Sequence, residues 1–297
     1  MRRRVAVTGA SSGLGKILVE KAVASGFEVL ALSRQRPDKK NLTCHWQSFD
    51  MANHSEDWAR LFSGCEAVIH LAAQKSAFNE ADRARLWAVN VEGTCRMIDA
   101  MRRAQVPHMV LAAAANLPAP NSISGFSSLS RSLYLASKLA QEWAALSGCR
   151  EAGIKCAALR ISSIIGDGYS VVDRIARTLL SGNLVNIAHN DCFGADLISA
   201  ADVAKGLLLA VNQQLQGTFH LSSGRRTSIG TAAYKLCEIA GVPNTLVCIQ
   251  RSEGEGDEGF PAVDCGPLLQ LGYEPRMLTE TLQEIIVRER EGQAPNK

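Results

Sequence analysis

Tyr134 and Lys138 are separated by one helical turn, so in a helix their side chains project from the same face. An ammonium group beside a phenol favours the phenolate and lowers the pKa of the phenol. Such a phenol is a proton donor or acceptor near neutral pH. A tyrosine and a lysine at this spacing usually form only a solvated helix face. The pair indicates a catalytic function only together with a segment that precedes it in the chain.

A glycine-rich segment, residues 8–15, stands far upstream of this pair and contains Gly9, Gly13 and Gly15. It follows a short apolar run and opens an amphipathic stretch, a pattern that predicts a strand, a tight turn and a helix. Glycines let the backbone approach a pyrophosphate, which then rests on the N–H groups and the positive dipole end of the helix. A dinucleotide site followed by a Tyr–Lys pair predicts hydride transfer coupled to proton transfer at a C–OH or C=O carbon.

The same glycine segment also matches the GxSxG nucleophile elbow of hydrolases, through Gly9, Ser11 and Gly13. That elbow normally follows several strands of its sheet, whereas this segment follows the first predicted strand. The sequence therefore disfavours a hydrolase.

The elements that must position these residues alternate between apolar, strand-like runs and helical patterns. Nearly continuous apolar strands between helices indicate a parallel sheet covered on both faces. We expect a Rossmann-like, doubly wound α/β fold, whose ligands bind at the carboxyl ends of the strands. The predicted strands are residues 4–8, 28–33, 43–48, 67–71, 108–113 and 155–161, and the predicted helices are residues 14–25, 57–62, 81–104 and 134–147.

Beyond residue 166 the alternation becomes less regular. Residues 1–166 are predicted to form a dinucleotide-binding Rossmann domain. Residues 167–297 are predicted to form a small mixed α/β substrate-binding region, with some chain crossing back to the Rossmann sheet. Its predicted helices are residues 171–181, 200–212, 229–240 and 278–291, and its predicted strands are residues 184–187 and 217–221.

Composition narrows the class of protein further. An apolar content of 46%, a charged content of 21% and a net charge of +3 are ordinary for a globular protein and favour neither nucleic acid nor a membrane as partner. The basic start is not followed by a long apolar run, so we expect no signal peptide and no transmembrane segment. Nine cysteines without CxxC spacing and six histidines without ligand spacing predict reduced thiols, no metal site and a cytoplasmic location.

The end of the second predicted strand bears on the choice of cofactor. In an NAD site an acidic residue there accepts from the ribose hydroxyls, but this strand ends in Ser33 followed by Arg34. A guanidinium pairs with a 2′-phosphate through charge-assisted hydrogen bonds, and Ser33 adds a hydroxyl. We therefore expect NADP(H) to be preferred, with NAD(H) as the second candidate.

With these motifs in place, the chain resembles the extended short-chain dehydrogenase/reductase family, which includes nucleotide-sugar epimerases, dehydratases and reductases. The resemblance covers nearly the whole length and rests on several short motifs in the family's order. Besides the glycine segment and the Tyr–Lys pair, these motifs lie at residues 49–51, 70–73, 90–94, 159–161, 165–166, 197–204, 217–224 and 271–275.

The resemblance implies roles for individual residues. Asp50 would accept from the adenine amino group, residues 71–73 would pass beside the cofactor ribose, and Asn90 would place Lys138 through a water molecule. Tyr134, Lys138 and Asn90 are the expected catalytic residues. The expected cofactor site comprises Gly9, Ser11, Ser12, Gly13, Leu14, Gly15, Ser33, Arg34, Asp50, Met51, Leu71, Ala72, Ala73, Lys75, Asn90, Ala112, Tyr134, Lys138, Ile161 and Ile164.

The chain departs from the family's pattern at two positions that concern the substrate. Where the family places a catalytic Ser or Thr after the fifth strand, this chain has Ala114, so that Asn116 or a serine between residues 122 and 132 is left to substitute. Where sugar-nucleotide epimerases commonly carry an Arg for the substrate diphosphate, this chain has Ala195, and Arg251 is the remaining candidate. Ala114, Asn116 and Arg251 are thus the expected substrate-binding residues.

The leading functional prediction is an NADP(H)-dependent oxidoreductase that reduces a carbonyl or oxidises a secondary alcohol of a small molecule, with a nucleotide-linked sugar as one candidate. The alternatives are an NAD(P)-dependent sugar-nucleotide epimerase or dehydratase that retains its cofactor, and a catalytically impaired nucleotide-binding protein. The resemblance also implies a homodimer formed through the helices predicted at residues 81–104 and 134–147.

Overall fold

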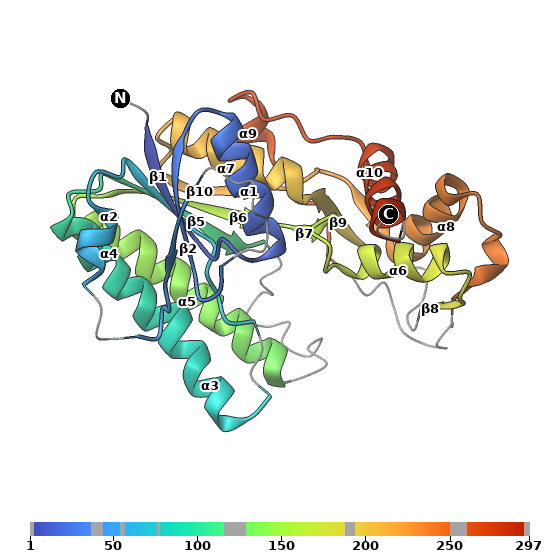
Figure 1. Ribbon diagram of the computed structural model, residues 1–297, viewed down its shortest axis with the longest axis horizontal. Coiled ribbons are helices and arrows are strands. Elements are labelled where there is room, and N and C mark those ends of the chain that lie inside the picture. The colour runs from blue at the N-terminus through green and yellow to red at the C-terminus, as the bar shows by residue number, and fades with distance from the viewer. Residues whose placement is uncertain are drawn as a thin grey trace. The chain divides into compact units, whose positions relative to one another are not determined.

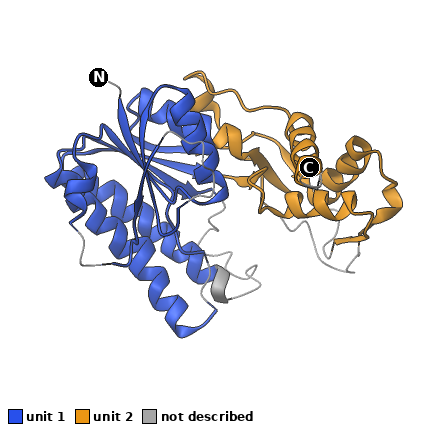
Figure 2. Cartoon of the chain, viewed as in Figure 1, with its two compact units in different colours: residues 1–161, 204–219 blue, residues 162–203, 220–297 orange. Residues whose placement is uncertain are grey.

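The computed structural model of the protein describes residues 3–36, 44–53, 57–75, 78–115, 129–187, 194–249 and 260–293. The chain forms two compact units (Figure 2): residues 1–161 with 204–219 make unit 1, and residues 162–203 with 220–297 make unit 2. The chain therefore leaves unit 1, returns to it and leaves again. The functional division at residue 166 stays a prediction.

Within the described residues, seven strands form the central sheet of unit 1 in the order β10-β6-β5-β4-β1-β2-β3 (Figure 1). Neighbouring strands from β6 to β3 pair in parallel. This is the doubly wound order, so the predicted Rossmann-like α/β fold is confirmed. The strands are β1 (Arg4–Thr8), β2 (Glu28–Ser33), β3 (His45–Ser48), β4 (Ala67–His70), β5 (His108–Ala114), β6 (Lys155–Ile161) and β10 (Gly217–Leu221).

Helices on both sides of the sheet explain why its strands are so apolar. All four residues of β4, and all of β1 except Arg4, are buried, as expected when both faces of a parallel sheet are covered. The helix α1 (Gly13–Ala24) packs on β1 and β2, while α5 (Leu129–Glu151) packs on β5 and β6 on the opposite side (Figure 1).

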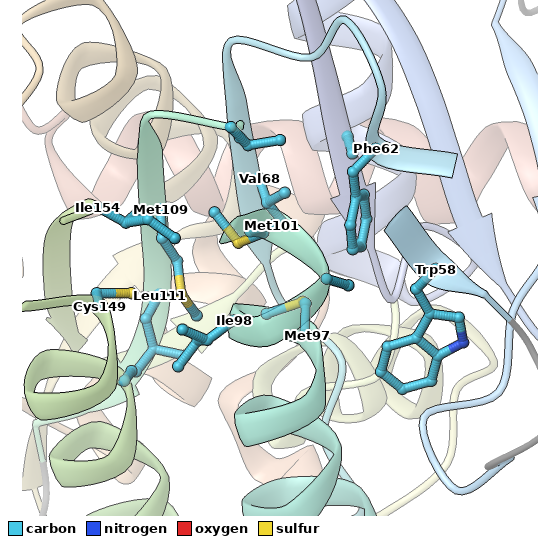
Figure 3. Packing of buried hydrophobic residues seen from close by; sticks show 14 of the residues in the cluster. Trp58, Phe62, Val68, Met97, Ile98, Met101, Met109, Leu111, Cys149 and Ile154 are labelled. Carbon is cyan, nitrogen blue, oxygen red and sulfur yellow. Dashed lines mark hydrogen bonds between the residues drawn. The ribbon is translucent and has the colours of Figure 1, made fainter. Parts of the chain in front are cut away.

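The core of unit 1 lies between the sheet and the helices α2 (Trp58–Phe62), α4 (Gly93–Arg103) and α5. Phe62, Met101 and Met109 are completely buried there, and Figure 3 shows them among other buried side chains of this cluster. Burying a side chain of this size contributes about 1.5–3 kcal/mol. This packing holds α5 against the sheet.

The helix predicted over residues 81–104 is interrupted. The structure has α3 (Glu80–Trp87), a π-helical turn (Ala88–Glu92) and then α4. At the junction Gly93 packs closely against another segment, because a Cβ there would lie 2.9 Å from Met51 Cε. Pattern analysis predicts one helix because a single π turn barely alters the apolar period, and such turns are frequent at functional sites.

Unit 2 is smaller and mixed in type. Among the described residues, β9 pairs in parallel with β7 and antiparallel with β11, while β12 pairs in parallel with β8. Three amphipathic helices pack around a second apolar core. Across both units, no described helix is long and apolar enough to cross a membrane. The elements of unit 2 are β7 (Ser163–Ile165), α6 (Val171–Leu180), β8 (Val185–Ile187), β9 (Gly194–Ser199), β11 (Arg226–Ser228), α8 (Ile229–Ala240), β12 (Val247–Ile249), α9 (Gly266–Leu269) and α10 (Leu278–Gln293), and α7 (Ala200–Asn212) leads back into unit 1.

Candidate active site

The turn between β1 and α1 has no room for side chains at two of its glycines. Gly9 has a φ of +72°, and a Cβ there would lie 2.9 Å from the backbone nitrogen of Ala72. A Cβ on Gly15 would lie 2.2 Å from the carbonyl oxygen of Gly9. Ser12 caps α1 by accepting the Gly15 N–H at 3.0 Å. This cradle at the positive end of a helix fits the pyrophosphate of a dinucleotide, and the residues predicted here, Gly9, Ser11, Ser12, Gly13, Leu14 and Gly15, all lie in it.

The segment that follows β4 lies against this turn. The backbone N–H of Ala72 donates to Thr8 Oγ1 at 3.2 Å, and Ala72 is the residue that a side chain on Gly9 would strike. Leu71, Ala72 and Ala73 are partly exposed beside the turn, and Lys75 is exposed. Their placement fits a ribose contact, which stays a prediction.

Lys138 projects from α5 to the carboxyl end of β5. Its Nζ donates to the carbonyl oxygen of Ala112 at 2.8 Å and also to Gln141 Oε1. Burial lowers the pKa of Lys138 to about 8, because removing an ammonium from water disfavours its charged form. The amine is therefore buried at the edge of the sheet where Rossmann folds bind their ligands.

Tyr134, one turn earlier on α5, does not have the acidified phenol expected from the sequence. Burial raises the pKa of Tyr134 above its usual value. The reason is that desolvation of the phenolate dominates, while the Lys138 ammonium donates to Ala112 and Gln141. The phenol is therefore protonated at neutral pH and is a proton donor.

Asn90 lies in the π-helical turn and is completely buried. Its Oδ1 accepts the Gln74 N–H at 2.8 Å, and its Nδ2 donates to the Gln74 carbonyl at 3.0 Å and to Ser137 Oγ at 2.9 Å. Ser137 Oγ donates in turn to the Tyr134 carbonyl at 2.7 Å. Asn90 thus ties the segment after β4 to the turn of α5 that carries Tyr134 and Lys138. The water-mediated link from Asn90 to Lys138 stays a prediction.

Asp50, expected to accept from adenine, is already paired within the protein. Both of its carboxylate oxygens accept from Arg85 Nη2 on α3, at 2.9 and 2.8 Å. Burial acts to raise the pKa of Asp50, but the hydrogen bonds from Arg85 and from the Ala52 N–H, together with the positive charges of Arg85 and Arg34, hold this pKa below the usual value. An adenine amino group would therefore share this carboxylate with Arg85. Met51, next in the chain, is buried and packs near Gly93 rather than facing solvent.

The two residues expected to select the cofactor, Ser33 and Arg34, differ in the solvent exposure of their side chains. Arg34 is exposed directly after β2. Ser33 is buried, its Oγ donating to the Gln35 carbonyl at 2.7 Å and accepting from Trp46 Nε1 at 2.9 Å. Of the two, only Arg34 has its polar group in solvent, where it can meet a 2′-phosphate.

Ala114 is the last residue of β5 and pairs with Ile161 on β6. It is partly exposed at the carboxyl edge of the sheet, the place where the family carries its catalytic hydroxyl. Ile161 is buried at the end of β6, and Ile164 is partly exposed in β7. Asn116 and Arg251 lie outside the residues that the structure describes.

Sequence reasoning missed two residues that contact the predicted site directly, namely Gln141 and Arg85. Gln141 stands three positions after Lys138, a helical spacing that could have drawn attention to it. Arg85 is far from Asp50 in the chain, so only the fold brings the two together.

A doubly wound sheet with a glycine cradle at its first turn defines the class of Rossmann-type dinucleotide-dependent proteins. Residues 5–221 match the NAD dependent epimerase/dehydratase family. The chain therefore belongs to this family, a part of the extended short-chain dehydrogenase/reductases, as its sequence motifs indicated. It is accordingly an NAD(P)-dependent enzyme of the oxidoreductase or epimerase type.

Individual relatives resemble the chain along its whole length. A putative UDP-glucose 4-epimerase of Methanocaldococcus jannaschii is 23% identical over 95% of this chain and 97% of its own. The crystal structure of Thermotoga maritima UDP-glucose 4-epimerase with UDP-glucose has a TM-score of 0.83 at 23% identity, covering 97% of this chain and 99% of that one. Thermus thermophilus UDP-glucose 4-epimerase in complex with NAD has a TM-score of 0.79 at 22% identity, with the same coverage.

Proposed function

We propose that the protein is a sugar-nucleotide epimerase or dehydratase that interconverts a C–OH and a C=O group and recycles a tightly held NAD(P). The observation that carries this proposal is the buried Lys138 ammonium on the Ala112 carbonyl, one turn from Tyr134 and at the carboxyl edge of the sheet. Bound NAD(P) would supply the hydride acceptor and donor.

Tyr134 is the proton donor and acceptor in this proposal. Since burial raises the pKa of the phenol, Tyr134 is protonated at rest and is ready to donate to a developing alkoxide. In the oxidising direction Tyr134 must first release its own proton to solvent, and the neighbouring Lys138 charge favours the phenolate that results. The phenolate then accepts the proton of the substrate hydroxyl. Asn90 holds the backbone that carries both side chains through Ser137.

Ala114 leaves the substrate oxygen without the hydroxyl that the family normally provides. By analogy with oxyanion donors, losing one such hydrogen bond costs on the order of 3 kcal/mol of transition-state stabilisation. Tyr134 therefore has to orient the substrate oxygen to a larger extent, and we expect slow turnover. Asn116 remains our candidate for a substitute donor, and Arg251 our candidate for the substrate diphosphate.

An epimerase or dehydratase is better supported than the NADP(H)-dependent reductase that the sequence predicts. The family to which the chain belongs is that of the NAD dependent epimerases and dehydratases. The relatives reported above, which match the chain over nearly its whole length, carry the name UDP-glucose 4-epimerase, one of them with the qualifier putative. The two readings differ in the fate of the cofactor. An epimerase retains NAD(P) and shows no net change in its redox state, whereas a reductase consumes NADPH.

Quantifying the nucleotide released from denatured protein, together with turnover of a panel of UDP-hexoses, tests this proposal. We expect close to one NAD(P) per chain and conversion of at least one sugar nucleotide without net NAD(P)H change. Stoichiometric NADPH consumption would support the reductase instead, and bound nucleotide with no turnover on the panel would support an impaired nucleotide-binding protein.

We also propose that Arg34 gives NADP(H) an advantage over NAD(H), although the NAD complex of the Thermus thermophilus enzyme is evidence on the other side. A charge-assisted hydrogen bond is worth about 1.5–3 kcal/mol, or roughly ten- to a hundredfold in affinity. Arg34→Asp should weaken NADP(H) binding by at least that factor in a calorimetric titration and should not weaken NAD(H) binding, because an acidic residue at this strand end accepts from the ribose hydroxyls. Arg36→Asp, at another exposed position of the same segment, is the matched control. Unchanged NADP(H) affinity in Arg34→Asp would show the assignment to be wrong.

We further propose a cytoplasmic homodimer. Trp87 on α3, which packs against α5, and Leu139 and Trp143 on α5 are exposed by 38%, 41% and 70% of their surfaces. Leu139 and Trp143 are one turn apart and face away from the buried Gln141. A second copy of the chain would cover this apolar face. Buried thiols such as that of Cys237 support a reducing compartment.

A further inference from the structure

Gln141 is a buried amide whose two polar atoms both contact groups of the candidate active site. It is completely buried on α5. Its Oε1 accepts from Lys138 Nζ, while its Nε2 lies 3.0 Å from His70 Nε2 and 3.1 Å from Thr94 Oγ1. Gln141 therefore connects the amine on α5 to the end of β4 and the start of α4.

The direction of each hydrogen bond follows from the charge on Lys138. An ammonium donates and cannot accept, so Gln141 turns its oxygen to Lys138 and its NH2 group to the other side. Thr94 Oγ1 donates to the Asn90 carbonyl at 2.8 Å and is free to accept from Gln141. His70 Nε2 accepts as well, which assigns the ring proton to Nδ1 and makes it the donor to Thr8 Oγ1 at 2.7 Å.

We propose that Gln141 is a positioning residue that holds the Lys138 ammonium in place and keeps it charged at the edge of the sheet. The inference deepens the proposed function and rests on it, because it gives Lys138 its catalytic importance. Without the Gln141 oxygen, the described protein acceptor that remains for Lys138 Nζ is the Ala112 carbonyl. A buried ammonium with fewer acceptors loses charge more readily.

The surroundings of Lys138 make this acceptor important. Burial and the positive charge of Lys75 lower the pKa of Lys138, and the charge of Glu142 opposes them. The Glu142 carboxylate is itself shared with Arg160, whose Nη2 donates to it at 2.8 Å. The titratable and charged groups that interact with Lys138 are Glu142 on α5, His70 on β4, Lys75 after β4, and Arg160 on β6 through Glu142. Tyr134 lies one turn earlier on α5.

The experiment measures the ionisation of Lys138 directly, by NMR titration of isotope-labelled lysine side chains in the protein as purified with its nucleotide. Lys138→Met identifies the resonance by its loss. Gln141→Met keeps the length of the side chain and removes the acceptor, whereas Gln141→Glu replaces it with a stronger one. Gln213→Met, at an exposed position after α7, is the matched control for the exchange of glutamine for methionine.

We expect the pKa of Lys138 to fall by about one unit in Gln141→Met, a tenfold loss in the ratio of charged to neutral amine, and to rise by at least one unit in Gln141→Glu. Gln213→Met should keep the native value. A native pKa in both Gln141 variants overturns the inference. If Gln141→Met does not fold, Gln141→Glu decides alone: a rise supports the inference and no rise refutes it. If the titrations follow the predicted order but no sugar nucleotide is turned over, the proposed function fails and the inference about Lys138 stands.

Discussion

His70 and Lys138 are two ionisable residues buried in one hydrogen-bonded network, and the positive charge of Lys138 opposes protonation of His70. Burial lowers the pKa of His70 to about 3, and the positive charge of Lys138 acts in the same direction. The imidazole is therefore neutral at physiological pH. Its two nitrogens contact Thr8 and Thr94, which brings the end of β1 and the start of α4 together.

The neutral state of His70 makes the stability of the protein depend on pH. Since the folded-state pKa of about 3 lies below the ordinary value of 6.5, the unfolded chain binds more protons between these two values. The free energy of unfolding therefore falls as the pH decreases from 6.5 towards 3, by at most about 1.4 kcal/mol per pH unit for one proton. We predict that His70→Asn lowers stability at pH 7 but gives a shallower decline between pH 6.5 and 4 in urea unfolding.

The same substitution at the exposed His45 on β3 is the control for removing a histidine. His45→Asn should decline as steeply as the native protein. A native slope in His70→Asn would contradict the assignment of a neutral, buried His70.

Among single residues, the sequence predicted those that helical spacing alone brings together. It did not predict those whose contacts or pKa values depend on residues far away in the chain. Tyr134 and Lys138 were recognised because helical spacing alone places them together. The raised pKa of Tyr134 was not foreseen, since it arises from burial by distant segments. The Arg85–Asp50 pair and the contacts of Gln141 with His70 join residues far apart in the chain, and no local pattern encodes them.

Among the elements, the β1–turn–α1 unit is the one most completely determined by sequence. Its glycines are required by close backbone approach at Gly15 and by a positive φ at Gly9. Both requirements are local, which explains why the segment could be recognised from residue types alone. The π turn at Ala88–Glu92 was missed because a single such turn barely alters the apolar period of the helix pattern.

We predict that Gly15→Ala prevents cofactor retention. The added methyl group would lie 2.2 Å from the Gly9 carbonyl oxygen, so the turn has to open. Overpacking of this kind costs about 1–3 kcal/mol. The measurements are the thermal unfolding midpoint and the nucleotide content of the purified variant. Gly292→Ala, where a Cβ meets nothing within 4 Å, is the control and should keep both. A Gly15→Ala protein that holds native amounts of nucleotide would contradict the role of this turn.

For the molecule as a whole, the main difficulty for sequence analysis was the return of the chain. Residues 204–219 belong to unit 1, and β10 joins the seven-stranded sheet after a long excursion into unit 2. The strands β7, β9, β11 and β12 were not predicted as such, and β7, β11 and β12 have only three residues each, too few to show a strand period.

The proposed homodimer makes a prediction at the same scale. Trp143→Arg places a charge in the exposed apolar face of α5, and burying an unpaired charge in an interface is strongly unfavourable. We expect the variant to be monomeric in light scattering after size-exclusion chromatography, at concentrations where the native protein is dimeric. Tyr169→Arg is the matched control, since Tyr169 is an aromatic residue with the same 70% exposure in unit 2. An unchanged dimer in Trp143→Arg would place the interface elsewhere.

The most direct test of the account is the turnover of Tyr134→Phe, which removes only the hydroxyl group proposed to carry the proton. With a UDP-hexose that the native protein converts, we predict a loss of about 10²- to 10⁴-fold in kcat, measured by NMR of the sugar, with nucleotide still bound. Native turnover in Tyr134→Phe would contradict the account, because proton transfer would then not depend on the phenol beside Lys138.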